Sequence, residues 1–169
     1  VCIMSFKEIS VSELSFNPFD KIGKQWMLIT AGDEKGYNTM TASWGFMGVM
    51  WGKNVIETVI RHSRYTLEFV EKSEFFTVSF YPESQREALK FCGTHSGRDC
   101  DKADESGLTP YFVDGTTAFE QAEMIFVCRR IFSQDMALEN LSEDNYRWYP
   151  DKDIHKVFIG EIVKVLVKE

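Results

Sequence analysis

Hydrophobic and polar positions alternate along the chain in short segments that are typical of β-strands. Residues 25–32, 38–44, 54–60 and 75–80 are short, rich in β-branched and aromatic residues, and bounded by Gly, Asn, Asp or Pro. The sequence DEKGYN, which lies between the first two segments, has the composition of a turn. The pattern therefore predicts four strands, the first two of them joined as a hairpin.

Two later segments, residues 123–134 and 155–169, are longer than an ordinary strand. In the second, alternation predicts one apolar face made of Val157, Ile159, Val163, Val165 and Val167. Lys164 and Lys168 are expected on the opposite face. Strands of this length suit a sheet that bends around a barrel, with Gly160 as a kink.

Helical patterns are few and short. They cover residues 64–72, 84–91 and 101–106, and Gly107 ends the last of them. Strands with isolated helices between them predict a mainly β fold, a closed or partly closed antiparallel barrel, rather than alternating βαβ units. No repeat, low-complexity tract or Pro/Gly-rich linker divides the chain, so residues 1–169 are expected to form a single domain.

The composition limits which binding partners and which cellular compartment are expected. A net charge of -7 argues against binding to nucleic acid, although a small anion held locally remains compatible with it. The four cysteines, Cys2, Cys92, Cys100 and Cys128, form no CxxC pair, so we expect reduced thiols and no metal site. No apolar run reaches the roughly 18–20 residues that span a membrane, and no signal segment is recognisable. We therefore expect a cytoplasmic protein with no membrane partner.

The sequence RHSRYTLEF, residues 61–69, concentrates hydrogen-bond donors in an acidic chain. A strand is predicted to end just before it and a helix to begin at Arg64, which makes Ser63 the N-cap. Together with Arg61, Arg64 and Thr66, a helix start would favour one small anion such as phosphate. A capped helix with both arginines in solvent explains the same residues equally well.

Three other places hold candidate chemistry. Residues 38–52 mix small, hydroxyl and aromatic side chains, which would let a flat ring approach backbone N–H groups. A glycine-rich hairpin with core tryptophans is the simpler interpretation. His155, at the entrance to the last strand, is either a surface histidine or a site residue.

The third place is the segment 92–102, which gathers hydroxyls, glycines and the cation Lys102. Cys92 and His95 suggest a catalytic pair, but no third group that would orient them is identifiable. An ordinary polar loop, one that can offer Lys102 to an anion, is the favoured interpretation.

Four motifs, MTASWG, RHSRYT, HSGRDCDK and HKVFIGEIVKV, follow one another in this order. Together they resemble the flavin reductase-like family with the FMN-binding split-barrel fold, particularly its flavoredoxin-like members. The resemblance extends from about Trp26 to Val167. It implies an antiparallel Greek-key split β-barrel with a few peripheral helices, and a homodimer that binds one FMN per subunit in a groove at the interface.

The resemblance also implies the residues of the FMN site. Those that would line the isoalloxazine ring are Thr41, Ala42, Ser43 and Trp44. Those that would hold the phosphate are Arg61, Ser63, Arg64 and Thr66. Those that would close over phosphate or ribityl oxygens are Ser96, Gly97, Arg98 and Lys102. His155 would stand near the ring or the nicotinamide, as the one catalytic residue.

The implied function is an oxidoreductase that accepts hydride or electrons on FMN, with NAD(P)H as the expected donor, and passes them to an acceptor. Two alternatives stay open: an FMN electron carrier between redox protein partners, and a flavin-binding protein without turnover. The sequence MGVMWGK stands where many reductases of this family have a proline-bearing loop, and residues 136–153 match no motif. The contacts on the substrate side are therefore not assigned.

Overall fold

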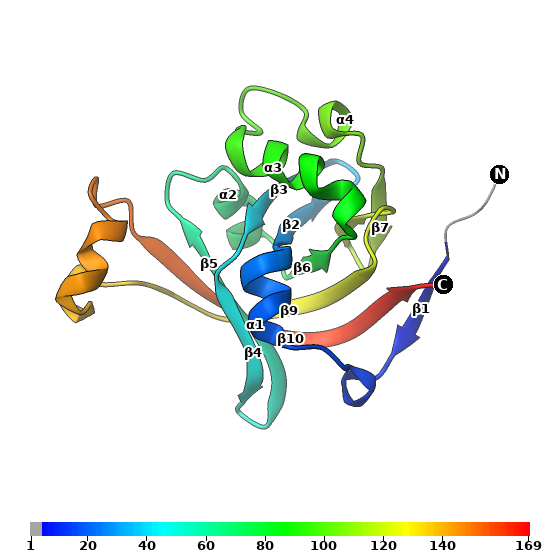
Figure 1. Ribbon diagram of the computed structural model, residues 1–169, viewed down its shortest axis with the longest axis horizontal. Coiled ribbons are helices and arrows are strands. Elements are labelled where there is room, and N and C mark those ends of the chain that lie inside the picture. The colour runs from blue at the N-terminus through cyan, green and yellow to red at the C-terminus, as the bar shows by residue number, and fades with distance from the viewer. Residues whose placement is uncertain (1–4) are drawn as a thin grey trace.

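Strands dominate the computed structural model, which describes residues 5–169 (Figure 1). Eight strands form one sheet: β1 (Phe6–Ile9), β2 (Met27–Asp33), β3 (Gly36–Ala42), β4 (Gly45–Met50), β5 (Lys53–Arg61), β6 (Phe75–Phe80), β9 (Met124–Asp135) and β10 (His155–Lys168). Their order is β3-β2-β6-β9-β10-β5-β4, with β1 added beside β10, and every pairing between them is antiparallel. β7 (Pro110–Val113) and β8 (Thr116–Phe119) form a separate hairpin.

The sheet is curved (Figure 1), and the two ends of its strand order, β3 and β4, are consecutive in the chain but do not pair with each other. Only Ser43 and Trp44 lie between them. The curved sheet therefore stays open at one seam, and this seam carries the first of the predicted site motifs.

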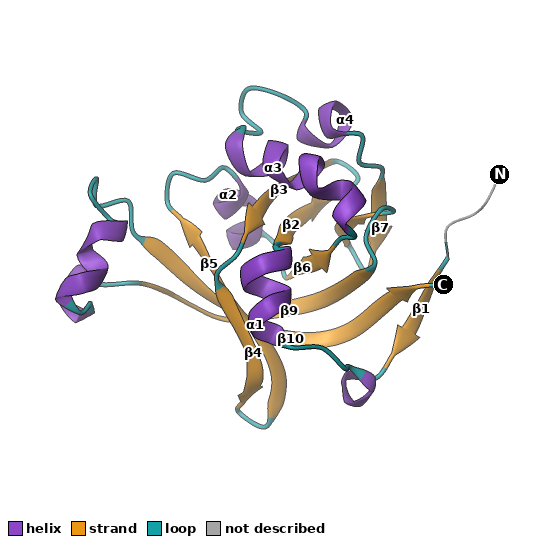
Figure 2. Ribbon diagram, in the orientation of Figure 1, coloured by secondary structure: helices purple, strands orange, loops and turns teal. Residues whose placement is uncertain are grey.

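Helices are short and gather mainly on one side of the sheet (Figure 2). They are α1 (Pro18–Asp20), which continues into a π-helical stretch (Lys21–Gln25), α2 (Thr66–Lys72), α3 (Arg86–Thr94) and α4 (Lys102–Ser106). Short 3₁₀ turns cover Val11–Glu13, Glu83–Gln85, Leu138–Asn140 and Glu143–Trp148. The last of these stands away from the other helices, at the far ends of β9 and β10 (Figure 2). None of the helices within residues 5–169 has the length and apolar character of a membrane span.

Two hydrophobic clusters form the core. One fills the concave side of the sheet around Phe76, Phe126 and Phe158, and the other lies between the sheet, α3 and the β7–β8 hairpin around Leu89 and Phe119. β2 contributes to both, since Met27, Ile29 and Ala31 belong to the first cluster and Leu28 to the second. Burial on both faces explains why this strand reads as a nearly continuous apolar run.

The six predicted strands and the hairpin at DEKGYN are confirmed within one or two residues at most boundaries. The sequence pattern does not predict β4, because GFMGVM contains no polar residue to alternate with the apolar ones, and none of these residues is buried in the sheet. Its place is set by backbone pairing with β5, from Gly45 opposite Thr58 to Met50 opposite Lys53. α4 ends at Gly107 as expected, with this residue in the left-handed conformation.

The single apolar face predicted for the last strand is wrong. Two register shifts interrupt its pairing with β9, one between Ile159 and Gly160 and the other between Ile162 and Lys164. Each irregularity changes which side chains face the core. Val163 is consequently 42% exposed, whereas Phe158 is fully buried. Gly160 marks the first shift, and a Cβ there would collide with Cys128 and the Phe76 ring.

The three described cysteines, Cys92, Cys100 and Cys128, are unpaired, in agreement with the prediction of reduced thiols; Cys2 lies outside the described residues.

Candidate functional site

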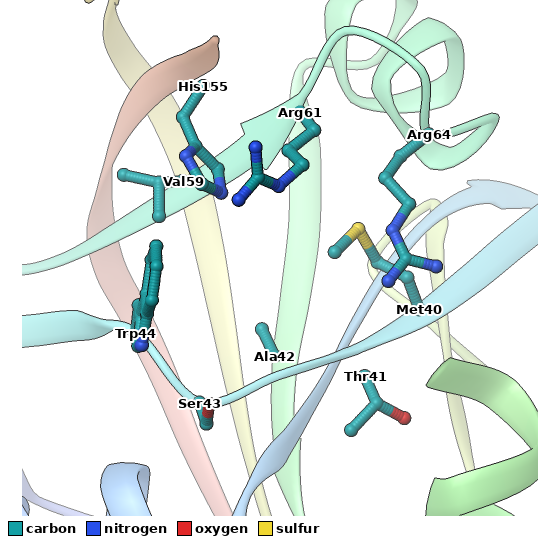
Figure 3. A pocket seen from close by; sticks show the side chains of 9 residues that line it. All are labelled: Met40, Thr41, Ala42, Ser43, Trp44, Val59, Arg61, Arg64 and His155. Atoms are coloured by element: carbon teal, nitrogen blue, oxygen red, sulfur yellow. The ribbon is translucent and has the colours of Figure 1, made fainter. Parts of the chain in front are cut away.

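A pocket of about 190 Å³, called here the first cavity, opens at the seam where β3 leads into β4 (Figure 3). It is lined by residues from β3, the link to β4, β5, the turn before α2, and the start of β10. These residues are Met40, Thr41, Ala42, Ser43, Trp44, Val59, Arg61, Arg64 and His155. Trp44, Arg61 and His155 point into the same space, and Arg64 reaches toward it from the turn before α2 (Figure 3).

A second cavity, of about 230 Å³, lies between α2 and the end of α3. Its lining residues are Ser63, Arg64, Tyr65, Thr66, Thr94, His95, Ser96 and Lys102. The structure thus brings the RHSRYT corner and the 92–102 loop together. Arg64 lines both cavities, so the two spaces meet at its side chain.

Arg64 is held by the end of α3. Its Nη1 and Nη2 atoms both donate to the carbonyl oxygen of Gly93, at 3.1 Å each. Burial, and then the nearby charge of Arg61, lower the pKa of Arg64. Because the carbonyl is neutral, the guanidinium keeps its full charge and has further N–H groups to offer. Arg64 is therefore a fixed cation at the junction of the two cavities.

Arg61 lies in the first cavity and not in the second, although the resemblance implied a phosphate contact. Its Nη1 donates to the carbonyl of Asp153 at 2.8 Å and its Nη2 to the carbonyl of Trp148 at 2.9 Å. The guanidinium also lies 5.0 Å from the centre of the Tyr149 ring. Arg61 thus anchors the segment 136–153, which the sequence left without an interpretation, against the first cavity.

Ser63 is not the N-cap of a helix, so that prediction is wrong. α2 begins at Thr66, and Tyr65 occupies the cap position without a side-chain hydrogen bond. The Oγ and N atoms of Ser63 both donate to the carboxylate of Asp153, at 2.5 and 3.1 Å. A carboxylate 90 residues away thus takes the donors that a local cap would have used.

Thr66 is buried beside the second cavity, and its Oγ1 accepts a hydrogen bond of 2.8 Å from Nδ2 of Asn38. Asn38 in turn packs against Gly97, where any Cβ would collide with its side-chain oxygen. Gly97 is therefore needed for close approach of the loop to β3. This packing explains the glycine without any contact to a ligand. The sequence offered no signal for Asn38.

The two cations of the 92–102 loop have different surroundings. Arg98 forms an ion pair with Glu68 at 3.1 Å, donates to the carbonyl of Ser63, and lines neither of the two cavities. Lys102 is only 5% exposed, and its Nζ donates to the carbonyls of Thr39 and Cys92, at 2.9 Å each. Burial lowers the pKa of Lys102 to about 8. Lys102 therefore brings an uncompensated positive charge to the second cavity, whereas Arg98 is neutralised.

The Cys92–His95 pair suggested by the sequence does not form among the hydrogen bonds of residues 5–169. Cys92 is buried and faces Ser106, while the His95 ring stacks on Phe91 with the ring centres 3.9 Å apart. Burial raises the pKa of the Cys92 thiol, which opposes a thiolate nucleophile.

His155 is buried at the wall of the first cavity, with only 6% of its surface exposed. Its Nδ1 lies 2.6 Å from the hydroxyl oxygen of Tyr149, and its ring centre is 5.4 Å from that of Trp44. Burial, and then the charge of Arg61, lower the pKa of His155 to about 4. The imidazole is therefore neutral at physiological pH. Tyr149 belongs to the segment without a motif, so no local signal could have indicated this partner.

The remaining residues predicted for the ring are at the seam. Thr41 lines the first cavity, but its hydroxyl donates to the Leu89 carbonyl of α3. Trp44 remains 40% exposed and packs edge-to-face on Trp148, with the ring centres 5.2 Å apart. The first cavity thus has an aromatic wall, a small-residue floor made by Ala42 and Ser43, and a neutral histidine.

Comparison with known proteins identifies relatives of the whole barrel. A family model described as the flavin reductase like domain matches residues 19–169. None of the curated proteins matches the chain significantly.

Three similar solved structures illustrate the match. The FMN-binding domain of a flavin reductases-like enzyme from Shewanella baltica has a TM-score of 0.69 and 17% identity, over 97% of this chain and 78% of that chain. A protein from Shewanella frigidimarina, assigned as a flavin reductase with a split barrel domain, has a TM-score of 0.67 and 21% identity, over 85% of this chain and 67% of that chain. The flavoredoxin of Desulfovibrio vulgaris has a TM-score of 0.67 and 20% identity, over 96% of this chain and 76% of that chain. These similarities confirm the predicted split-barrel fold.

The buried state of His155 predicts a pH-dependent stability. An unfolded histidine has a pKa near 6.5, whereas the folded protein holds this one near 4. Between these values the unfolded chain binds a proton that the folded chain does not, so the free energy of unfolding falls as the pH is lowered through this range. We measure the free energy of unfolding in urea at pH 7 and at pH 5. From pH 7 to pH 5 it should fall less in His155→Gln than in the unmodified protein. Equal losses in the two proteins would contradict a neutral, buried His155.

Proposed function

Because the chain belongs to the flavin reductase-like family, whose model matches residues 19–169, we propose that it is an FMN-dependent oxidoreductase that takes hydride from NAD(P)H and passes electrons to an acceptor. The observation that carries the proposal is the pair of cavities joined at Arg64. One is walled by Trp44 and small residues, and the other is cationic. This pairing fits a ligand with a flat ring system at one end and a phosphate at the other.

The first cavity suits the ring end of FMN. Ala42 and Ser43 leave room for a flat ring close to the backbone, and Trp44 supplies an apolar wall. At about 190 Å³ the first cavity alone is smaller than the 300–1,000 Å³ typical of ligand sites, so the ligand would also occupy the space beyond it. When bound, FMN would supply the redox chemistry by accepting a hydride or two electrons.

The second cavity suits the phosphate. Arg64 and Lys102 are held by neutral carbonyl oxygens, so their charges remain available to an anion. The hydroxyl of Ser96 lies in the same lining. Arg61 and Arg98 would act less directly, since Arg61 lies in the first cavity and Arg98 is paired with Glu68. Ser63 is bonded to Asp153, and Thr66 would line the site next to Asn38.

The chain's own groups would orient the reactants. Hydride transfer needs no strong base, and a neutral His155 in an aromatic wall is consistent with this requirement. Trp44 and His155 would exclude water from one side of the first cavity and define where a nicotinamide can lie. His155 would therefore contribute by contact with the ring or the nicotinamide.

An absorption spectrum tests this function. The purified protein should be yellow, or become so with FMN, and NADH or NADPH should bleach the flavin band rapidly without another protein. A flavin band that only a protein donor can bleach would favour the electron carrier, and the absence of any bound flavin would contradict both functions. Binding without turnover by any donor would indicate the flavin-binding alternative.

Removal of the cation at the junction should weaken FMN binding. We expect Arg64→Ala to lower the binding free energy by about 1.5–3 kcal/mol, the range for a lost hydrogen bond to a charged group. Fluorescence titration of the apoprotein with FMN measures the change. Arg130→Ala is the matched control, because Arg130 also donates to backbone carbonyls, those of Ser73 and Glu71, but lines neither cavity. Equal affinities for Arg64→Ala and the control would refute the phosphate role.

An apolar face beside the site supports the homodimer. Five large side chains around β4 make up this face, which covers both sides of the strand, and they are between 37% and 73% exposed: Phe46, Val49, Met50, Trp51 and Phe132. They belong to β4, its turn to β5, and β9, and the rings of Trp51 and Phe132 are 6.0 Å apart. Clusters of exposed apolar groups mark interaction sites in soluble proteins. Phe46 also lines an apolar cleft with Trp44, so the face borders the first cavity, as an interface site for FMN would require.

Charge introduced into this face should prevent dimer formation. We expect the unmodified 19.6 kDa chain to sediment as a dimer and Val49→Glu to sediment as a monomer, since the substitution would bury a carboxylate. Val163→Glu is the control, because Val163 is also an exposed valine of the sheet but belongs to β10, which contributes no side chain to this face. Sedimentation equilibrium at micromolar concentration distinguishes the states, and a monomeric unmodified protein would argue against the dimer.

A further inference from the structure

Tyr149 and His155 form a buried pair at the wall of the first cavity. The hydroxyl oxygen of Tyr149 lies 2.6 Å from Nδ1 of His155, and the two residues are 8% and 6% exposed. Either the phenol donates to an unprotonated Nδ1, or a protonated Nδ1 donates to the phenol oxygen. The two arrangements place the imidazole proton on opposite sides of the ring, so they give His155 different functions.

The surroundings of the phenol favour the first arrangement. If Nδ1 were the donor, the phenol proton would need another acceptor, and the one available within residues 5–169 is the Sδ atom of Met136 at 3.5 Å. A thioether is a weak acceptor. In addition, 2.6 Å is shorter than the usual range for an N–H group that donates to an oxygen. The phenol therefore donates to Nδ1.

The charges around the pair keep the imidazole neutral. Arg61 is the cross-strand partner of His155, and Arg64 lies in the same cavity. Asp153 is the acidic group nearby, and its carboxylate is already bonded to Ser63. A neutral imidazole carries one proton, so an unprotonated Nδ1 requires a protonated Nε2.

We propose that Tyr149 is a positioning residue that fixes His155 as the neutral tautomer with its proton on Nε2, so that His155 presents a hydrogen-bond donor to the ligand. No hydrogen bond from the described residues reaches Nε2, and the ring points into the first cavity between Trp44 and Arg61 (Figure 3). The ligand atom opposite it is then an acceptor, such as a carbonyl oxygen or an unprotonated ring nitrogen. The identity of that ligand rests on the proposed function, whereas the tautomer does not.

Arg61 fixes the position of Tyr149 relative to His155. Its guanidinium lies over the Tyr149 ring and holds the carbonyls of Trp148 and Asp153, which flank the tyrosine in sequence. The segment that carries Tyr149 is thereby fixed relative to β5, the strand that pairs with the start of β10. The position of the phenol is thus set by two strands and one arginine.

Nitrogen NMR of the ¹⁵N-labelled protein without FMN tests the proposal. In the unmodified protein, Nδ1 of His155 should have the chemical shift of an unprotonated nitrogen and Nε2 that of a protonated one. In Tyr149→Phe the two shifts should move toward each other, because both tautomers become populated. Tyr146→Phe, a change at an exposed tyrosine of the same segment, should leave them unchanged.

Two results would overturn the proposal: a protonated Nδ1 in the unmodified protein, or unchanged shifts in Tyr149→Phe. If Tyr149→Phe does not fold, Met136→Leu serves instead. Loss of the thioether should leave both shifts unchanged, whereas a change would mean that the phenol proton points to Met136. Titration of the same sample with FMN separates the two proposals, because a protein with the expected tautomer that binds no flavin would refute only the proposed function.

Discussion

The pairing of β5 with β10 is the constraint on which the site depends. It sets Arg61 directly opposite His155 at the end of two long strands. From that position Arg61 reaches the backbone of Trp148 and Asp153 and draws an otherwise separate segment onto the sheet. The same segment delivers Tyr149 to the imidazole and a carboxylate to Ser63. One cross-strand pair therefore organises one wall of the first cavity and the turn that leads to the second.

The chain is acidic overall, but the second cavity is positively charged because its cations are hydrogen-bonded to neutral groups. Arg64 and Lys102 are bonded to carbonyl oxygens, so burial fixes their positions without cancelling their charges. Arg98, by contrast, is paired with Glu68 and serves to attach the loop to α2. A buried cation without a counterion is costly, as the lowered pKa of Lys102 reflects. An anionic ligand would relieve that cost, which is why the proposed function assigns the phosphate of FMN to the second cavity.

In the proposed function, the seam of the barrel would hold the ring of FMN. Because β3 and β4 are the unpaired edges of the sheet, the backbone between them is not occupied by a neighbouring strand. Ser43 and Trp44 lie there, and the exposed apolar side chains of β4 continue from the same place. The open seam, the aromatic wall and the proposed dimer face are thus consequences of one topological feature.

The sequence by itself determined those features that depend on neighbouring residues. Alternation over five to eight residues located the strands, and four ordered motifs indicated the family and contain the lining of both cavities apart from Val59 and Thr94. It failed where distant groups compete with local ones. Ser63 looks like a cap until Asp153 takes its donors, Val163 appears buried until two bulges turn the strand, and Arg61 appears free until Trp148 and Asp153 occupy it. Tyr149 and Asn38 have no signal, since their partners lie on other elements. Only the tertiary structure decides these contacts, because a hydrogen bond is formed by whichever partner packing brings nearest, regardless of its distance along the chain.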